Sequence, residues 1–286
     1  MKFDFITTLI LVCTVALIAL TYIIRIAVRG RAHYDRIDKQ GGSALLSKGV
    51  MEGAYWSMQP VAKLLVFFRV TPNMVSWASL ATGFLAGACL AVGHFGFGAV
   101  FSITSALLDA LDGMVARITG VSSDSGEVLD AAVDRYVEFF FIGGLLIYYR
   151  HFPSLLILAL AALIGSFMIS YSTAKAEALG VSPPKGSMRR PERAAYLSIG
   201  AALSPFTIPV FEAVRDYPVA IGHPMVMALC LVALVANFSA AERFLAIARE
   251  MRKREFEKLL AKTADAETQD ECASENVRIA SREHTR

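Results

Sequence analysis

Charged residues are scarce in this chain of 286 residues: Asp, Glu, Lys and Arg make up 19%, against 55% hydrophobic residues. That balance argues against a soluble domain and is typical of a polytopic, all-α membrane protein. Cysteine is scarce too, and the four residues lack the spacing of a metal site or a disulfide framework. Internal repeats, glycine-rich phosphate loops and nucleic-acid motifs are missing, so we expect no nucleic-acid partner.

Apolar runs divide the chain into seven predicted membrane spans. Each run is long enough, or nearly so, to cross about 30 Å of hydrocarbon as a helix. The first run is followed by no small-residue cleavage site, which favours an uncleaved anchor over a signal peptide. The runs lie near 5–24, 74–93, 97–117, 126–149, 153–173, 194–214 and 224–241.

Positive charge is distributed unevenly between the loops. Segments 25–71, 174–193 and 243–258 are rich in Lys and Arg, whereas the opposite side offers only Lys2, Arg150 and Arg215. Because cytoplasmic loops carry the excess of positive residues, the basic side is predicted to be cytoplasmic. The prediction is a multi-pass protein of the inner (cytoplasmic) membrane.

Four carboxylates interrupt the third and fourth apolar runs, in the pattern D-x2-D-G-x2-A-R-x8-G-x3-D-x3-D. Each Asp near a bilayer centre costs roughly 2.5–3.5 kcal/mol, so an uncompensated set would oppose insertion by about 10 kcal/mol. Bound cations are the natural compensation, and oxygen ligands suit Mg²⁺ or Mn²⁺, with two ions matching four carboxylates. The predicted metal ligands are Asp109, Asp112, Asp130 and Asp134.

The spacing predicts that these residues meet. Asp109 to Arg117 fall on one stripe of a 3.6-residue helix, and Gly126 to Asp134 fall on one face of the next. Residues 118–125 are turn-rich, so we expect the two helices to pack as an antiparallel pair. Gly113, Ala116 and Gly126 leave bare backbone beside the carboxylates, where a flat group could approach.

This pattern resembles, position for position, the signature of the CDP-alcohol phosphotransferase family, which displaces CMP from a CDP-activated alcohol. The resemblance extends to Thr71-Pro72-Asn73-Met74 and to roughly residues 45–245. It implies a six-transmembrane-helix core. The distribution of positive charge predicts that the Asp cluster opens to the cytoplasm. The predicted division is an anchor with a basic linker (1–43), the membrane domain (44–245) and a charged cytoplasmic tail, partly disordered (246–286).

The resemblance also implies roles for the signature residues. Asp109, Asp112 and Asp130 are the expected metal ligands, and Asp134 is the candidate general base, with a share in metal binding left open. For Glu138, one turn beyond, a supporting or packing role is favoured over catalysis. The residues expected to contact the CDP group of CDP-diacylglycerol are Gly113, Ala116, Arg117 and Gly126.

The five positive charges from Lys175 to Arg193 suit an anionic acceptor. The stretch from Tyr171 to Arg193 is similar to the Y-x-x-A-[RK]-A-E-x-L-G…R-P-E-R pattern of prokaryotic phosphatidylinositol phosphate synthases, which implies an inositol 1-phosphate acceptor. Positive-inside anchoring is the competing explanation for these charges. The predicted acceptor-phosphate residues are Lys175, Arg190 and Arg193.

Alternatives stay open at this point. Glycerol 3-phosphate or serine would serve the same chemistry as acceptor, a cation transporter could use intramembrane Asp residues, and a non-catalytic scaffold could keep the fold. Membrane lipids are expected partners, and a homodimer is left open.

Two further segments flank the core. Residues 44–70 interleave aromatic and basic residues, which predicts an interfacial amphipathic helix, broken or bent at Pro60. The tail from about 255 lacks apolar periodicity, which predicts a frayed helix followed by disorder.

Overall fold

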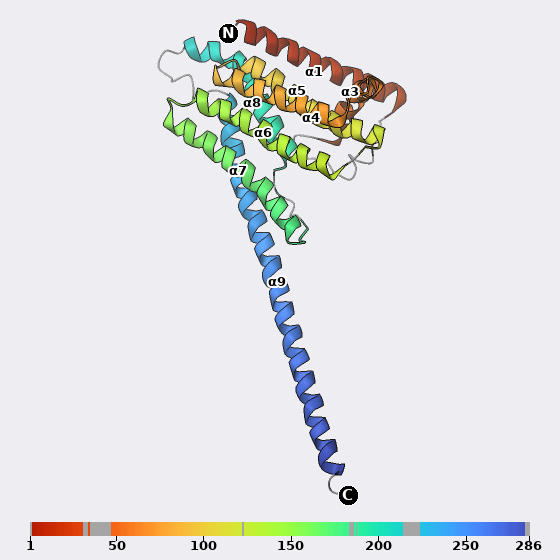
Figure 1. Ribbon diagram of the computed structural model, residues 1–286. Helices are drawn as coiled ribbons and strands as arrows, with labels where there is room; N and C mark the ends of the chain where they lie inside the picture. The colour runs from red at the N-terminus through yellow and green to blue at the C-terminus, as the bar shows by residue number, and fades with distance from the viewer. Residues whose placement is uncertain are drawn as a thin grey trace. The chain divides into compact units, whose positions relative to one another are not determined.

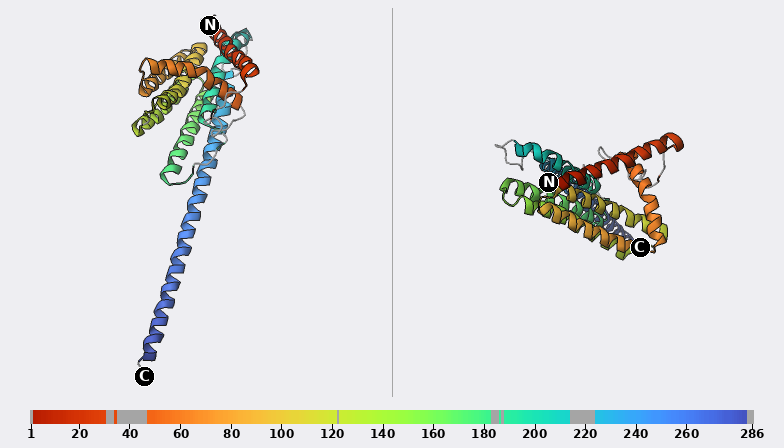
Figure 2. Two further views of the ribbon diagram at one scale, coloured as in Figure 1. Left: turned by 90° about the vertical axis from the view of Figure 1, so that its right-hand side faces the viewer. Right: turned by 90° about the horizontal axis from the view of Figure 1, so that it is seen from above.

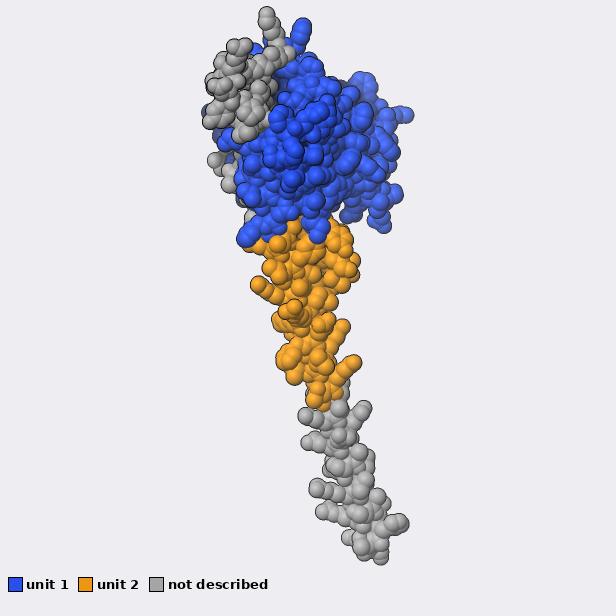
Figure 3. Space-filling view, turned by 90° about the vertical axis from the view of Figure 1, so that its left-hand side faces the viewer, with its two compact units in different colours: residues 1–168, 187–238 blue, residues 169–186, 239–286 orange. Residues whose placement is uncertain are grey.

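The computed structural model describes residues 2–30, 34, 47–121, 123–182, 186, 188–213 and 224–283. The described residues form eight helices (Figure 1). They divide into two compact units: residues 1–168 with 187–238, and residues 169–186 with 239–286 (Figure 3). The helices are α1 (Lys2–Arg29), α3 (Lys48–Phe67), α4 (Pro72–Ala91), α5 (Phe95–Thr119), α6 (Asp124–Tyr148), α7 (Pro153–Ala178), α8 (Arg190–Ala213) and α9 (Pro224–Glu283).

The chain is an all-helical integral membrane protein. Five of the described helices are long and apolar enough to cross a membrane: α1, α4, α5, α7 and the first part of α9. A helix lies at each of the seven predicted spans, but α6 and α8 are not among these five. Charged residues recur along the first four turns of α6, among them the signature carboxylates Asp130 and Asp134.

Local sequence signals set the ends of the two signature helices and of α4. Thr71 accepts a hydrogen bond from the amide of Met74 at the start of α4, where Pro72 occupies a first-turn position. α5 ends at Gly120, which has a φ of 67° and so takes the left-handed conformation that glycine adopts without strain. Ser123 then caps α6 by accepting from the amide of Gly126. The predicted turn between the signature helices is confirmed.

The predicted direct pairing of α5 with α6 is wrong along most of their length. α4 packs against both helices, whereas α5 and α6 contact each other only sparsely (Figure 1). Glycines permit this arrangement, because a Cβ on Gly87 would collide with the carbonyl of Phe140 and one on Gly144 with the carbonyl of Gly87. α4 can therefore lie between α5 and α6, and the signature helices converge at the end where the turn joins them.

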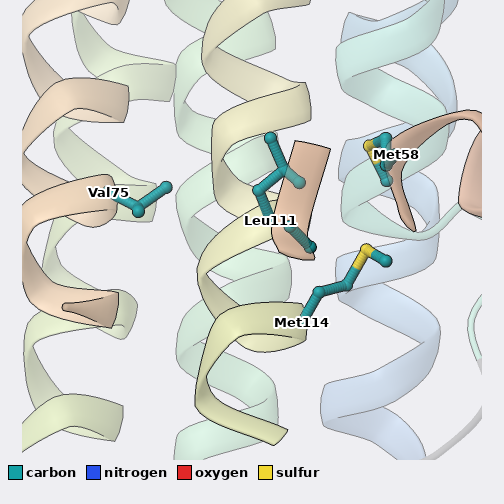
Figure 4. Packing of buried hydrophobic residues seen from close by; sticks show 5 residues of the cluster. Met58, Val75, Leu111 and Met114 are labelled. Carbon is teal, nitrogen blue, oxygen red and sulfur yellow. The ribbon is translucent and has the colours of Figure 1, made fainter. Parts of the chain in front are cut away.

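A small apolar cluster fixes α3 behind the signature stripe of α5. Met58 and Ala62 of α3, Val75 of α4, and Leu111 and Met114 of α5 are buried against one another (Figure 4). α3 continues through Pro60 as one helix, so of the two predicted alternatives the break is wrong and the bend stays a prediction. Pro60 lies between Met58 and Ala62, whose burial holds the helix on both sides of the missing amide.

α1 contacts other helices of the first unit near each end of α1. Near its start, Asp4 accepts from the amide of Gly96 at 3.2 Å and lies 2.8 Å from Nδ1 of His94. Near its C-terminal end, the buried Tyr22 hydroxyl lies 3.2 Å from the Glu52 carboxylate of α3. Figure 2 shows α3 crossing from that end of α1 toward the start of α4.

The second unit contains the end of α7 and most of α9. Ala176, Val181 and Ile247 form its apolar cluster, and Arg254 donates to the carbonyls of Leu179 and Gly180. The backbone of α9 is helical through Glu283, where the sequence predicted a frayed helix passing into disorder. Some of the basic residues used to predict orientation lie outside the described residues. They are Arg31, Arg36, Lys39, Lys185 and Arg215.

Candidate active site

Three signature carboxylates meet in the first unit. Asp109 and Asp112 come from α5 and Asp130 from α6, and each offers an oxygen atom within 4.8 Å of the other two. Asp112 is buried, and the other two are partly buried. The helical spacing of the sequence predicted this convergence correctly.

Ser76 supports the cluster from α4. Its hydroxyl donates to Oδ2 of Asp112 at 2.7 Å, and both side chains are buried. The bond orients the Asp112 carboxylate. Sequence reasoning missed this residue. The available signal was a serine one turn after the Thr71-Pro72-Asn73 helix start.

Asp134 lies beside this cluster rather than within it. Its Oδ1 is ion-paired with Arg190 of α8, and its Oδ2 lies 3.7 Å from the guanidinium of Arg135. Arg190 also donates to both carboxylate oxygens of Asp109, each at 3.4 Å. One arginine therefore bridges Asp109 and Asp134, an arrangement that the sequence did not predict.

A second arginine of α8 pairs with α6 one turn further on. Arg193 donates from Nε to Oε1 of Glu138 at 2.9 Å and from Nη2 to Oε2 at 3.3 Å. The side chain of Arg193 is 0% exposed, whereas that of Arg190 is 33% exposed. Arg190 can reach a soluble molecule, but Arg193 is enclosed by the protein.

The residues predicted to contact CDP lie around the same end of the signature helices. Gly113, Ala116 and Gly126 are partly buried, and Arg117 is exposed. A Cβ on Gly126 would lie 3.1 Å from the Ser123 hydroxyl and 3.7 Å from Oδ1 of Asn73. Asn73, from the first turn of α4, is thus a neighbour of this face that the sequence did not assign to the site.

The three residues predicted for the acceptor phosphate are divided between the units. Arg190 and Arg193 belong to the first unit, while Lys175 is an exposed residue of the second unit. Only the two arginines are placed beside the carboxylates. The grouping of all three stays a prediction.

The donor set fits a divalent cation. Three closely spaced carboxylates are hard oxygen ligands, and one of them, Asp112, is oriented by a hydrogen bond from a neighbouring helix. Asp109 and Asp112 belong to α5, which is apolar enough to cross a membrane, and a charged group there needs compensation. Fold and site together define a multi-pass membrane protein with a carboxylate cluster that could hold a metal ion.

Comparison with known proteins identifies the family. The sequence model of the CDP-alcohol phosphatidyltransferase family matches residues 69–240, and the chain belongs to that family. The protein is a phosphatidyltransferase enzyme, as the signature predicted. The matched residues include the whole Asp signature, α8 and the start of α9, whereas α1 and α3 precede them.

Curated relatives point to one branch of the family. The chain is 34% identical to the phosphatidylinositol phosphate synthase of Corynebacterium glutamicum over 172 residues, which cover 58% of this chain and 78% of the relative. The enzyme of the same name from Mycolicibacterium smegmatis is 37% identical over 151 residues, covering 51% and 68% respectively.

Solved structures agree with this similarity. The Mycobacterium tuberculosis phosphatidylinositol phosphate synthase in complex with manganese and citrate aligns with a TM-score of 0.58 and 28% identity, covering 66% of this chain and 88% of that chain. The same enzyme with CDP-DAG bound aligns with a TM-score of 0.57 and 28% identity, covering 66% and 92%.

Proposed function

We propose that this enzyme transfers the phosphatidyl group of CDP-diacylglycerol to a phosphorylated polyol such as inositol 1-phosphate and releases CMP. The observation that carries the proposal is the convergence of Asp109, Asp112 and Asp130 on helices that the family model matches. The names of the relatives and the CDP-DAG bound to one of them support the choice of donor and acceptor.

The reaction requires a hydroxyl oxygen to attack the lipid-side phosphorus. A new P–O bond forms to the acceptor, and the bond between that phosphorus and the oxygen of CMP breaks. Asp134 is the proposed base for the hydroxyl proton, since it lies one helical turn beyond Asp130, beside the carboxylate cluster. Arg190 lies against Asp134 and Asp109, where it can hold an anionic group and orient both carboxylates.

Asp109, Asp112 and Asp130 are the proposed ligands of Mg²⁺ or Mn²⁺, with two ions as the proposed number. A share of Asp134 in metal binding stays a prediction. The manganese in the Mycobacterium tuberculosis structure supports this assignment. The chemistry supplied by such cations is neutralisation of the diphosphate charge and stabilisation of the departing CMP. Gly113, Ala116, Gly126 and the exposed Arg117 are proposed to contact the CDP group.

For the acceptor phosphate, the geometry favours Arg190 over Arg193. The partly exposed Arg190 guanidinium can contact a soluble anion, whereas Arg193 is fully buried and occupied by Glu138. Arg193 then acts by positioning α8, and Lys175 stays a proposed contributor. A bidentate arginine is well suited to a phosphate group because its planar fork matches the anion.

The proposed membrane arrangement has six core spans, α4 to α9, with α1 as an additional N-terminal span and α3 at the interface. The proposed location is the inner membrane with the carboxylate cluster open to the cytoplasm. The excess of Lys and Arg on the predicted cytoplasmic side supports this orientation. The division at residues 43 and 245 and the homodimer stay predictions.

A panel of acceptors tests the proposal. Purified protein is given CDP-diacylglycerol with inositol 1-phosphate, glycerol 3-phosphate, inositol or serine, and CMP release is followed. We expect turnover with inositol 1-phosphate and little with inositol or serine. Use of a neutral or zwitterionic alcohol alone would overturn the acceptor assignment and leave the family assignment intact.

A further inference from the structure

A cavity of about 460 Å³ lies between α1 and α3, and none of the signature residues line it. Ile18 and Thr21 of α1 face Trp56, Gln59 and Lys63 of α3 across this space. Its volume falls within the usual range for small-molecule sites. Both helices precede the residues that match the family model.

Specific contacts hold the two walls together. Tyr22 is buried between the helices, where its ring occupies the space that a side chain on Gly53 would need and its hydroxyl meets Glu52. The Arg25 guanidinium lies 5.8 Å from the ring centroid of Trp56, a cation–π distance. The cavity is therefore a built feature of the fold.

The lining combines apolar, polar and cationic side chains. Ile18, Trp56 and Pro60 supply hydrocarbon, while Lys63 supplies an ammonium group and Gln59 an amide. Lys63 makes no ion pair with any residue that the structure describes, and its side chain is exposed. The Lys63 ammonium is therefore accessible to an anionic ligand.

Exposed hydrocarbon beside Lys63 indicates what kind of molecule carries that anion. Val61 and Leu64 flank Lys63 and are 44% and 55% exposed, and Phe67 one turn on is 77% exposed. Such a surface is stable against acyl chains, and Trp with Lys at its edge is typical of the headgroup level of a bilayer. A small water-soluble anion would leave this hydrocarbon uncovered.

We propose that the α1–α3 cavity binds the headgroup of an anionic phospholipid. The lipid phosphate lies at the Lys63 ammonium, the Gln59 amide contacts headgroup oxygens, and the first acyl carbons lie against Trp56 and Ile18. The site is separate from the catalytic carboxylates, so the inference does not depend on the proposed reaction.

The two tryptophans of the chain, Trp56 and Trp77, permit a direct test. Trp77→Phe leaves Trp56 as the reporter of the cavity, and Trp56→Phe leaves Trp77, an exposed residue of α4, as the reference. Each full-length variant is reconstituted in phosphatidylcholine vesicles that contain equal mole fractions of brominated phosphatidylglycerol or brominated phosphatidylcholine. Bromine quenches tryptophan fluorescence on contact.

We expect phosphatidylglycerol to quench Trp56 preferentially and the two lipids to quench Trp77 alike. Lys63→Gln should lower the preference of the Trp56 site for phosphatidylglycerol over phosphatidylcholine about tenfold, as expected for one hydrogen bond to a charged group. Lys63→Arg should retain it. Arg29→Gln is the matched control, because Arg29 is a cation in the last turn of α1 and does not line the cavity.

Three results would overturn the inference: equal quenching of Trp56 by both lipids, a preference that survives Lys63→Gln, or an equal loss in Arg29→Gln. The last result would indicate general attraction between the basic surface and the bilayer. Loss of the preference on addition of glycerol 3-phosphate would also overturn it, since a soluble phosphate would then be the occupant.

Discussion

Arg193 of α8 and Glu138 of α6 form a two-point ion pair in which the arginine side chain is completely buried. The pair lies one turn along both helices from the contact of Arg190 with Asp134. Two successive arginines of α8 therefore face two successive acids of α6. The Arg190–Asp134 pair lies at the signature carboxylates, and the Arg193–Glu138 pair is enclosed by protein.

The buried pair predicts a loss of stability in variants that remove one partner. Arg193→Gln or Glu138→Gln leaves a buried charge uncompensated, which costs about 3–5 kcal/mol. We expect the thermal midpoint of the purified protein in detergent to fall sharply in both variants. The exposed Arg117 offers a control, since Arg117→Gln should leave the midpoint unchanged. A stable Arg193→Gln variant with weakened acceptor binding would instead indicate direct contact with the acceptor.

For substitution of Arg190 we predict a different outcome from that of Arg193. We expect Arg190→Gln to raise the KM for the phosphorylated acceptor by about tenfold or more, the equivalent of about 1.5–3 kcal/mol for a hydrogen bond to a charged group. The KM for CDP-diacylglycerol should change much less. Steady-state titration of each substrate in turn separates the two effects. An equal rise in both constants would argue that Arg190 acts only by orienting Asp109 and Asp134.

We predict that Ser76 raises the metal affinity of the site by orienting Asp112. Ser76→Ala removes the 2.7 Å hydrogen bond that orients this carboxylate, and loss of such support lowers metal affinity by about 10–100-fold. The Mg²⁺ or Mn²⁺ concentration that gives half-maximal CMP release should rise accordingly. Ser79→Ala is the control one turn further along α4, because Ser79 bonds to Ser105 and not to a carboxylate. Identical metal titrations for both variants would remove Ser76 from the site.

At Gly126 we predict that a larger side chain hinders binding of the CDP-lipid by steric collision. A larger side chain there would enter the space beside Ser123 and Asn73, so Gly126→Leu should raise the CDP-diacylglycerol requirement or stop turnover. Thermal stability should be largely kept. Gly143, also on α6, has no atom within 4 Å of its Cβ position, and Gly143→Leu should leave the titration unchanged. An unaltered titration for Gly126→Leu would limit this glycine to helix capping and packing.

The sequence predicted the carboxylate cluster because the relevant information is local. Asp109 and Asp112 share a helical stripe, Asp130 follows a short turn, and a 3.6-residue period places them together without knowledge of other helices. The position of α4 between α5 and α6 could not be predicted in this way. It depends on the backbone contact between Gly87 and Gly144, and no single-helix pattern identifies which glycines meet.

The same reasoning explains the residues that were missed or reassigned. Ser76 resembles any small residue of an apolar helix until α4 is placed against Asp112. For Arg193, the positive charges and the family resemblance gave a phosphate-binding prediction. The pairing of Arg193 with Glu138 could not be foreseen, because it depends on the placement of α8 against α6. A prediction of positive charge near the site was correct for Arg190, whose guanidinium contacts two signature carboxylates.

The most direct test of the central claim is metal-dependent release of CMP from CDP-diacylglycerol by the purified full-length protein. We expect turnover with inositol 1-phosphate in Mg²⁺ or Mn²⁺, none in excess EDTA, and recovery when the metal is restored. Asp112→Asn and Asp130→Asn should insert normally and yet remain inactive at every metal concentration, since each removes a charged ligand. Full activity in EDTA, or in either Asn variant, would contradict the account.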